Sequence, residues 1–274
     1  MPELPEVETI VRDLRPCLVG RRIGKAHLSH DDVLRGVTRR RLLRRLPGTT
    51  IRNVCRRAKH AVLELDTLRL VIQPGMTGSL LVYSRPLQPA EARYAVLRLE
   101  LDRGDQLVYT DVRRLGTILL LDQKQWNAYD HAIGPEPLDD AFSAERLGSA
   151  LKRSRQAVKK VIMDQRHLAG VGNIYANEAL FAAGIDPSKP ARRLRPDDHR
   201  RLHAELRRIL TAAIHSNGTT FRDYRTGTGE PGNFQLELLV YGREGEPCRR
   251  CGTRLTGTHA IDARISVFCH RCQS

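Results

Sequence analysis

The stretch "AVLELDTLRLVI" at residues 61–72 contains two short apolar runs that are separated at Asp66 and Thr67. Apolar and polar residues alternate within it, which is typical of β-strands that bury one face. Four similar runs follow without a helical segment between them: "SLLVY", "AVLRLEL", "QLVYTD" and "GTILLLD". Several consecutive strands without intervening helices indicate a sandwich or a barrel. The sequence therefore predicts an all-β region over residues 50–122.

The segment before this region has a helical period instead. Its apolar residues recur three or four positions apart: Val7, Ile10, Val11, Leu14 and Leu18. This spacing predicts one helix over residues 5–19 that stops at Gly20. The run "RGVTRRRLLRRLPG" at 35–48 is strongly basic and ends in a Pro-Gly turn.

The pattern changes again after "IGPEPLDD" at 133–140, a proline-rich stretch that predicts a domain boundary. Spaced apolar residues beyond it predict four helices: 143–152, 155–165, 173–184 and 197–216. A glycine-rich loop, "TGTGEPGN", follows at 226–233, and the last forty residues contain four of the six cysteines. The chain is thus expected to have a β region, a helical region and a short cysteine-rich region.

The charge balance narrows the choice of partner. Lys and Arg total 46 against 31 acidic residues, which gives a net charge of +15 and a pI near 10.1. Such a surface repels itself and favours a polyanion, with nucleic acid ahead of an anionic membrane. Arg also suits bidentate contacts with phosphate. No apolar run is as long as a membrane span and no export signal is recognisable, so we expect a cytoplasmic protein with reduced thiols.

Four of the cysteines form two C-x2-C pairs: Cys248 with Cys251, and Cys269 with Cys272. Four thiolates make the tetrahedral shell that zinc prefers, with no open position for a water. They predict one structural Zn2+, which would supply folding energy to a segment with little core. Two disulfides are the alternative, which a reducing cytoplasm disfavours. Cys17 and Cys55 lie outside any motif, and we expect both to be buried as apolar residues.

A pair of glycines, Gly170 and Gly172, directly precedes a predicted helix that begins near Asn173. Glycines permit close approach of the backbone, and a helix start offers free N–H groups to an anion. The junction therefore suggests a phosphate site, with a plain turn as the alternative.

Seven motifs, in order along nearly the whole chain, closely resemble the bacterial formamidopyrimidine-DNA glycosylase family. They are "PELPEVET" at the tip, "RRAKH" at 56–60, "GMTGSL" at 75–80, "YTDVRRLG" at 109–116, "GVGNIYANEALFAAGI" at 170–185, "ELLVYGREGEPCRRCG" at 237–252 and the terminal C-x2-C.

The resemblance implies an α+β multidomain fold. It divides the chain into an N-terminal β-sandwich catalytic domain with a leading helix at 1–134, a helix-two-turn-helix DNA-binding domain with a lesion-capping loop at 135–236, and a zinc-finger ribbon at 237–274. Members of the family excise oxidised purines, chiefly 8-oxoguanine and formamidopyrimidines, and cut the DNA backbone at the abasic site. The implied partner is double-stranded DNA with oxidised bases or abasic sites. The implied protein is a monomer of the bacterial cytoplasm, associated with the nucleoid and not with a membrane.

The resemblance also implies the nucleophile. Removal of Met1 would leave Pro2 as a secondary amine that attacks the sugar C1′, expels the damaged base and forms an iminium. An α-amino group has an ordinary pKa of about 7.7–8.0, so a sizeable fraction is neutral at physiological pH. Glu3 would transfer the proton and Glu6 would orient the lesion or a water. Both carboxylates also suit a helix start for reasons of charge alone, which is the alternative for them.

Two basic residues would assist the subsequent eliminations. Lys59, in "RRAKH", resembles the lysine that donates a proton or contacts phosphate during β-elimination. Arg264, five residues before Cys269, resembles the ribbon arginine that assists δ-elimination and holds the phosphate beside the flipped nucleotide.

A wedge would fill the space that a flipped base leaves in the stack. Met76 and Arg113 correspond to two of its residues, and Arg113 would face the orphaned base and favour cytosine. Leu115 stands where the family usually has Phe, and Val112 where it usually has Pro. Leu115 is apolar but cannot stack, so these departures concern preference among lesions and opposite bases.

Further contacts to the DNA are implied at scattered positions. Asn173 and Lys159 would bind phosphate, and the loop 221–234 would close over the flipped lesion. Gln73 stands where a His is usual and can still donate to a phosphate. Tyr94 is the nearest candidate for a strand histidine of the family that has no clear match.

Two other functions remain open on the sequence. A sister class that resembles endonuclease VIII acts on oxidised pyrimidines and shares the tip proline, Glu3 and the zinc ribbon. It usually lacks the "ELPEV" form, the Met/Arg wedge and the long capping loop. A non-catalytic zinc-ribbon DNA-binding protein would account for the charge and the cysteines alone.

Overall fold

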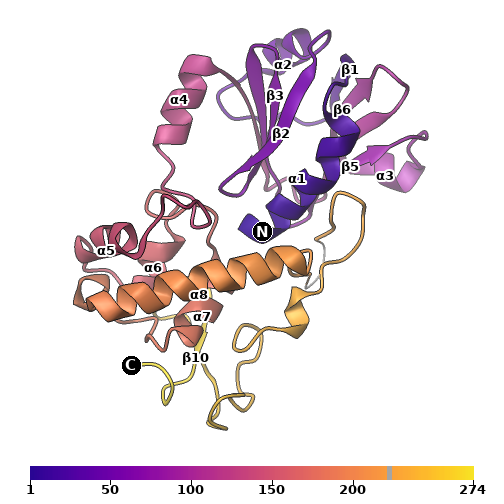
Figure 1. Cartoon of the computed structure of the whole chain (residues 1–274). Helices are drawn as coiled ribbons and strands as arrows, with labels where there is room; N and C mark the ends of the chain where they lie inside the picture. Colours follow the sequence, from indigo (N-terminus) through magenta and orange to yellow (C-terminus); the bar gives the residue numbers. More distant parts are fainter. Residues whose placement is uncertain (221–223) are drawn as a thin grey trace. The chain divides into compact units, whose positions relative to one another are not determined.

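The computed structural model describes residues 1–220 and 224–274, which fall into two compact units. Unit 1 comprises Met1–His131 with Ser216–Asn233, and unit 2 comprises Ala132–His215 with Phe234–Ser274 (Figure 1). In the described part of the chain, no helix is both long enough and apolar enough to cross a membrane.

Unit 1 is built on two four-stranded antiparallel sheets. One has the order β1-β6-β7-β5: β1 (Ile23–Leu28), β6 (Ala95–Leu101), β7 (Gln106–Asp111) and β5 (Gly78–Tyr83). The other has the order β2-β3-β4-β8: β2 (Ile51–Arg57), β3 (His60–Leu65), β4 (Leu68–Gln73) and β8 (Thr117–Asp122). All six strand runs of the sequence pattern form strands, so the prediction of a sandwich is confirmed.

Helix α1 (Leu4–Leu18) contributes its apolar side to the core of this sandwich. It packs chiefly on β2, with smaller contacts to β3 and β5. The helix begins at Leu4 because a capping box satisfies its first turn, where the Glu3 N–H donates to the Glu6 carboxylate at 2.8 Å. It ends before Gly20, whose φ of +84° suits glycine. The predicted helix is therefore confirmed, with each bound shifted by one residue.

Three short helices of unit 1 have no counterpart in the predicted elements: α2 (Arg39–Arg45), α3 (Pro89–Arg93) and α4 (Gln123–His131). In α2 the Thr38 hydroxyl accepts from the Arg41 N–H, and Leu42 is buried. Only one buried side chain lies within its seven residues, so the apolar period is too short to detect.

Unit 2 contains the four predicted helices: α5 (Ala144–Lys152), α6 (Val158–Met163), α7 (Asn173–Ala182) and α8 (Pro196–His215). Helix α7 packs against α8 and α6, and α8 also packs against α5. Single 3-10 turns occur at Ala191–Arg193 and Phe234–Leu236. Strands β9 (Thr256–Thr258) and β10 (Ser266–Phe268) form the hairpin of the cysteine-rich segment. The predicted α+β class is thereby confirmed.

The compact units group the chain differently from the three domains 1–134, 135–236 and 237–274. The segment 216–233 belongs to unit 1, and the cysteine-rich segment belongs to unit 2 together with the helices. The three-domain division stays a prediction. The expectation for Cys17 is wrong, since this residue is exposed while Leu14 and Leu18 form the buried side of α1. Cys55 is half-buried against a small cluster that includes Val62 and Val71.

Candidate active site

The first candidate group lies where α1 begins, in unit 1. Pro2 is buried, and Glu3 and Lys59 are each only 4% exposed. Three charged or potentially reactive groups are therefore withdrawn from water at one end of the sandwich. Burial of charged groups is costly without compensation, and such clusters are typical of functional sites.

Glu6 ties the start of α1 to the segment 216–233 of the same unit. Its Oε2 accepts from the Glu3 N–H at 2.8 Å, and its Oε1 accepts from the Thr219 N–H at 2.8 Å. The Tyr224 hydroxyl donates to the Glu6 carbonyl at 3.2 Å. Glu6 therefore has a structural role in this state of the protein, because both carboxylate oxygens accept from the backbone.

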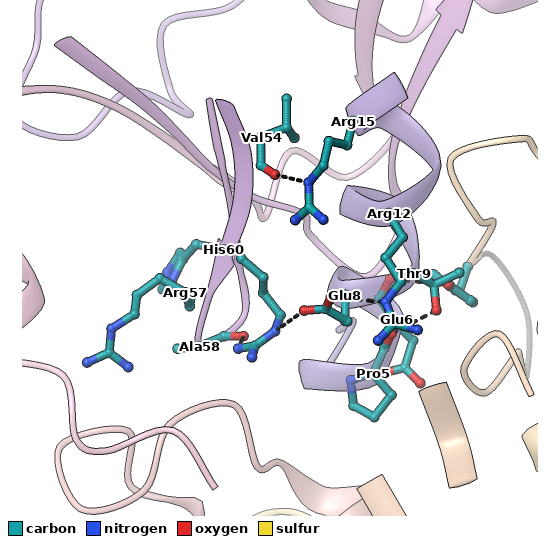
Figure 2. A network of polar contacts seen from close by, with 12 residues as sticks. Pro5, Glu6, Glu8, Thr9, Arg12, Arg15, Val54, Arg57, Ala58 and His60 are labelled. Atoms are coloured by element: carbon teal, nitrogen blue, oxygen red, sulfur yellow. Dashed lines mark hydrogen bonds and ion pairs between the residues drawn. The ribbon is translucent and has the colours of Figure 1, made fainter. Parts of the chain in front are cut away.

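Lys59 lies in the two-residue turn that joins β2 to β3. The turn places the non-glycine residue Ala58 at a φ of +51°, in the left-handed region that such residues rarely adopt. Arg56 supports it, donating to the Glu8 carboxylate of α1 at 2.9 Å and to the Ala58 carbonyl at 3.0 Å. Figure 2 shows Glu8 on the side of α1 that faces this hairpin. The lysine is therefore presented by a turn that is braced against the helix of the N-terminus.

The terminal amine, carried here by Met1, shares this environment. Burial lowers the pKa of the amine below its ordinary value, Glu3 and Glu6 oppose that shift, and the positive charges of Lys59 and Arg113 add to it. Desolvation is the largest cause. The amine thus lies within electrostatic range of four of the predicted site residues, all of them in unit 1.

Two exposed loops of unit 1 carry the predicted wedge. The Met76 side chain is 42% exposed and that of Leu115 is 57% exposed, which is unusual for large apolar residues. Val112 is exposed beside them in the sequence, and Arg113 is exposed as well. Such a group of protruding apolar side chains on a basic protein suits insertion into a base stack.

The buried carboxylate of Asp111 joins these two loops. Its Oδ1 accepts from the Thr77 hydroxyl at 2.5 Å, and its Oδ2 accepts from the Gly116 N–H at 2.9 Å. The Thr77 hydroxyl in turn accepts from the Arg113 N–H at 3.0 Å. A Cβ at position 75 would collide with the Asp111 carboxylate, so only glycine allows this approach. The two loops of the predicted wedge are therefore joined by one buried acid, for which the sequence alone predicts no role.

Gln73 and Tyr94 lie in or next to the strands of unit 1. The Gln73 amide donates to the Met1 sulfur at 3.4 Å and accepts from the Thr117 hydroxyl at 3.4 Å. Gln73 is thus adjacent to Met1 at the N-terminus. Tyr94 is 38% exposed directly before β6, and its contact with DNA stays a prediction.

A second group of predicted residues belongs to unit 2. Lys159 of α6 is fully buried, and its ammonium donates to the Ser266 hydroxyl at 2.7 Å and to the Ile265 carbonyl at 2.9 Å. Asn177 of α7 accepts from the Val267 N–H at 2.8 Å. Two helices therefore hold strand β10, which lies just beyond Arg264. A phosphate contact by Lys159 stays a prediction, because its ammonium contacts β10 here.

Arg264 and Asn173 are more accessible. The Arg264 guanidinium is 3.5 Å from the Asp262 carboxylate, and half of the arginine side chain is exposed to solvent. Asn173 is half-buried at the first position of α7, directly after Gly172. The predicted glycine-rich start of this helix is confirmed, and its use by a phosphate stays a prediction.

Four thiols meet in the C-terminal segment of unit 2. The sulfur atoms of Cys248, Cys251, Cys269 and Cys272 all lie within 4.8 Å of one another. A tetrahedral zinc site with Zn–S distances of about 2.3 Å requires sulfur separations of about 3.8 Å, so the donor set fits one metal ion. The distances of 4.0 Å from Cys248 to Cys272 and 3.5 Å from Cys251 to Cys269 are too long for disulfides.

Glu178 of α7 is a further residue whose role is not evident from the sequence. Its buried carboxylate accepts three backbone N–H groups, from Leu239 at 2.9 Å, Val240 at 2.9 Å and Tyr241 at 2.8 Å. It thereby fixes the chain that leads into the cysteine-rich segment. The "NEALF" part of a quoted motif contains this residue, but its partners lie about sixty residues away.

Glu178→Gln is expected to destabilise unit 2 by about 1–3 kcal/mol, because an amide NH2 would face one of these N–H donors. Thermal unfolding monitored in the C-terminal half tests this expectation. Glu205→Gln is the control, since Glu205 pairs with Arg208 on the surface of α8. Equal stability of the two variants would show that the three bonds contribute nothing measurable.

The loop 221–234 is only partly described. Residues 221–223 lie outside the described residues. The part that follows is attached to α1, where the Asp13 carboxylate accepts from the Gly227 N–H at 2.9 Å. Its closure over a lesion stays a prediction.

Comparison with known proteins identifies one family. The profile of the formamidopyrimidine-DNA glycosylase N-terminal domain matches residues 1–118, and that of the formamidopyrimidine-DNA glycosylase H2TH domain matches residues 133–225. The formamidopyrimidine-DNA glycosylase of Stutzerimonas stutzeri (strain A1501) is 44% identical over 273 residues, which cover 100% of both chains.

Solved structures agree with this assignment. A variant of Lactococcus lactis FPG in complex with Fapy-dG-containing DNA has a TM-score of 0.90 at 32% identity, with 100% of both chains covered. A complex between Lactococcus lactis Fpg and abasic-site DNA has a TM-score of 0.89 at 32% identity, with 99% of both chains covered. This chain belongs to the formamidopyrimidine-DNA glycosylase family.

Proposed function

We propose that this chain excises oxidised purines from duplex DNA with its N-terminal amine and then cleaves the abasic site by β,δ-elimination. As a member of its family it is a bifunctional DNA glycosylase and AP lyase of base excision repair. The mechanism is supported chiefly by the burial of Pro2, Glu3 and Lys59 together where α1 begins. The enzyme would act as a monomer on chromosomal DNA, in the bacterial cytoplasm at the nucleoid.

The first step requires removal of Met1, after which Pro2 carries the amine. Pro2 is itself buried, so its amine stays desolvated and has a neutral fraction at physiological pH. The nitrogen lone pair forms a bond to C1′, and the electrons of the glycosidic bond leave with the base. Glu3 supplies the proton for the leaving base or the sugar oxygen, the C1′-bound nitrogen gives up its own proton, and opening of the C1′–O4′ bond then gives the iminium.

The second stage uses the iminium as an electron sink. Its positive charge acidifies the C2′ proton, whose loss expels the 3′ phosphate, and a further elimination expels the 5′ phosphate. Lys59 donates a proton or holds a phosphate, and its buried, braced turn keeps its ammonium near the amine. Arg264 would neutralise a leaving phosphate, on a loop whose following strand is fixed by Lys159 and Asn177.

Lesion recognition would use the two loops that Asp111 joins. Met76 and Leu115 would fill the space of the flipped base, and Arg113 would face the orphaned cytosine. Leu115 has no aromatic face, so its contribution is apolar contact without stacking. The substrate class is supported by the Fapy-dG and abasic-site DNA in the solved relatives.

The four-cysteine group would hold one Zn2+, because thiolates in tetrahedral positions with no open site are the ligands of structural zinc. When bound, the metal supplies folding energy and not chemistry. Arg264 lies in the same cysteine-rich segment, so binding of the metal would also hold this arginine in position for a phosphate.

The pH dependence of imine formation offers a test of the amine. Burial lowers the pKa of the Met1 amine in this structure. Because Pro2 is buried as well, we expect the same direction for the pKa of its amine, so that the rate of imine formation rises at a lower pH than for an exposed amine. Lys59→Met removes a positive charge, which raises that pKa and moves the rising limb to higher pH. Glu3→Gln removes a negative charge and moves it to lower pH. The rate of borohydride trapping on a preformed abasic site, measured against pH, gives the pH at which the rate rises in each variant. A shift of this pH in the same direction in both variants would contradict the role of the terminal amine.

Trapping assays on a set of DNA lesions distinguish the proposed purine glycosylase from the two other functions that the sequence leaves open. Borohydride trapping should be strongest on 8-oxoguanine opposite cytosine and on formamidopyrimidine, and weak on thymine glycol. Preference for thymine glycol would favour the pyrimidine-specific class instead. Binding without cleavage of an abasic site would favour a non-catalytic DNA-binding protein.

A further inference from the structure

The basic run at 35–48 forms a surface that excision does not use. Three arginines of α2, namely Arg40, Arg44 and Arg45, are exposed, and Arg41 is half-buried. They share one side of the helix, because positions four apart are neighbours on its surface. The opposite side packs Leu42 and, just past the helix end, Leu46 into the core of unit 1. We call these four arginines the α2 face.

The α2 face is not neutralised by the protein itself. Among residues 1–220 and 224–274, none of the ion pairs includes any of its four arginines. The acids closest in the sequence have other partners, since Asp31 pairs with Arg39 at 2.5 Å and Asp32 pairs with Arg114 at 2.8 Å. Like charges four positions apart destabilise an isolated helix. The arginines of the α2 face therefore repel one another, and a bound polyanion would reduce this repulsion.

The α2 face lies away from the candidate nucleophile within unit 1. The chain after α2 is bonded to the chain after α1, with the Gly20 N–H donating to the Ile51 carbonyl at 2.8 Å and the Gly48 N–H to the Ile23 carbonyl at 2.7 Å. Pro2 precedes the other end of α1, whose 15 residues extend about 22 Å. In Figure 1, α2 is drawn at the end of the sandwich opposite the N-terminus. The α2 face is thus about one length of α1 away from Pro2, too far for the phosphates beside a lesion held at Pro2 to be its partner.

We propose that the α2 face binds the phosphate backbone of a second segment of duplex DNA while the first occupies the lesion site. Arginine is the side chain best suited to phosphate oxygens, and the relatives with solved complexes bind DNA. The run contains no aromatic, Asn or Gln residue that could stack on or read a base, so the contact is independent of sequence. Its function is direct transfer of the enzyme from one duplex to another.

Direct transfer has a kinetic signature that simple dissociation lacks. The enzyme is bound to a fluorescent short duplex that carries an uncleavable abasic analogue, and unlabelled undamaged duplex is added at rising concentration. The wild-type dissociation rate should increase with that concentration. In the triple variant Arg40→Gln, Arg44→Gln, Arg45→Gln, the dissociation rate should not depend on the concentration of the unlabelled duplex. The salt slope of binding to undamaged duplex should fall by about 0.9 for each phosphate that the variant no longer neutralises.

The matched control removes the same charge from arginines that have acidic partners: Arg85, Arg166 and Arg208, each changed to Gln. The dissociation rate of this control variant should increase with the concentration of competitor duplex as it does in the wild type. A rate independent of competitor in the wild type, or the same dependence in the triple variant, would overturn the proposal. Equal acceleration by polyglutamate would also overturn it, because the surface would then bind acidic polymers in general.

Excision on a short lesion duplex is measured in parallel and should differ by less than about twofold between the three proteins. Loss of excision in all three would count against the proposed function alone, since the transfer assay uses DNA that is not cut. Thermal unfolding checks that the triple variant is folded; removal of repulsion should leave its stability equal or higher.

Discussion

Insertion of one Ala between Met1 and Pro2 is expected to reduce base excision and abasic-site cleavage by about 10³-fold or more. The nitrogen of Pro2 would then belong to a peptide bond, whose resonance removes the lone pair that attacks C1′. Single-turnover cleavage of a duplex with 8-oxoguanine opposite cytosine measures the loss. Intact mass establishes that the wild-type chain has lost Met1 and that the extended chain has not lost its Ala.

The extended chain should still bind DNA. Affinity for a duplex with an uncleavable abasic analogue should stay within about threefold of the wild type, because the wedge loops and the second unit are unchanged. Cleavage by the extended chain at the normal rate would contradict the role of the terminal amine. Loss of binding together with cleavage would indicate misfolding, and the role of the amine would then be decided by mapping the residue that is trapped on DNA.

Cys269→Ser is expected to abolish binding of the proposed Zn2+ and to lower abasic-site cleavage by about 100-fold or more, because zinc sites of this kind supply about 10–16 kcal/mol of apparent binding energy to folding. Cys269 follows β10 directly, and Arg264 precedes that strand, so loss of the metal frees the arginine from its position. Native mass spectrometry gives the metal content, and gel assays give the cleavage rate.

Cys17→Ser is the control for this variant. Cys17 is exposed on α1 and takes no part in the four-cysteine group, so metal content and cleavage should be unchanged. A Cys269→Ser protein with full metal content and normal cleavage would contradict the structural role of the site. Zinc removal by a chelator should reproduce the defect, and its reversal on adding Zn2+ would separate metal loss from the mutation.

Most of the strands follow from local pattern. The six runs between residues 61 and 122 are short apolar segments that Gly, Pro or Asp residues separate, and each forms a strand whose apolar residues are buried or half-buried. The sequence does not predict β1 and β2 as runs, since exposed His27 in β1 and half-buried Arg56 in β2 interrupt their apolar pattern. Helix α2 is obscured by its own charge, because five arginines leave too few apolar positions to define a period.

The candidate catalytic and metal-binding residues can be predicted from motifs, whereas the residues that hold them in position cannot. Pro2, Glu3 and Lys59 stand in short motifs, and the cysteines have diagnostic spacing. Asp111 and Glu178 act on partners far away in the sequence, so no local pattern reports their function. The resemblance implies a phosphate contact for Lys159, which stays a prediction; in the structure its buried ammonium donates to Ser266 of β10. The positive charge of a lysine in the sequence therefore does not show whether its ammonium binds a ligand or donates to another part of the protein.

The most direct test of the central claim is the identity of the residue that becomes attached to DNA. The wild-type protein is trapped with borohydride on a duplex with 8-oxoguanine opposite cytosine, digested, and mapped by mass spectrometry. We expect the sugar on the N-terminal peptide, at the Pro2 nitrogen, with Met1 absent. An adduct on Lys59 or on any other lysine, with an unmodified N-terminal peptide, would contradict the mechanism.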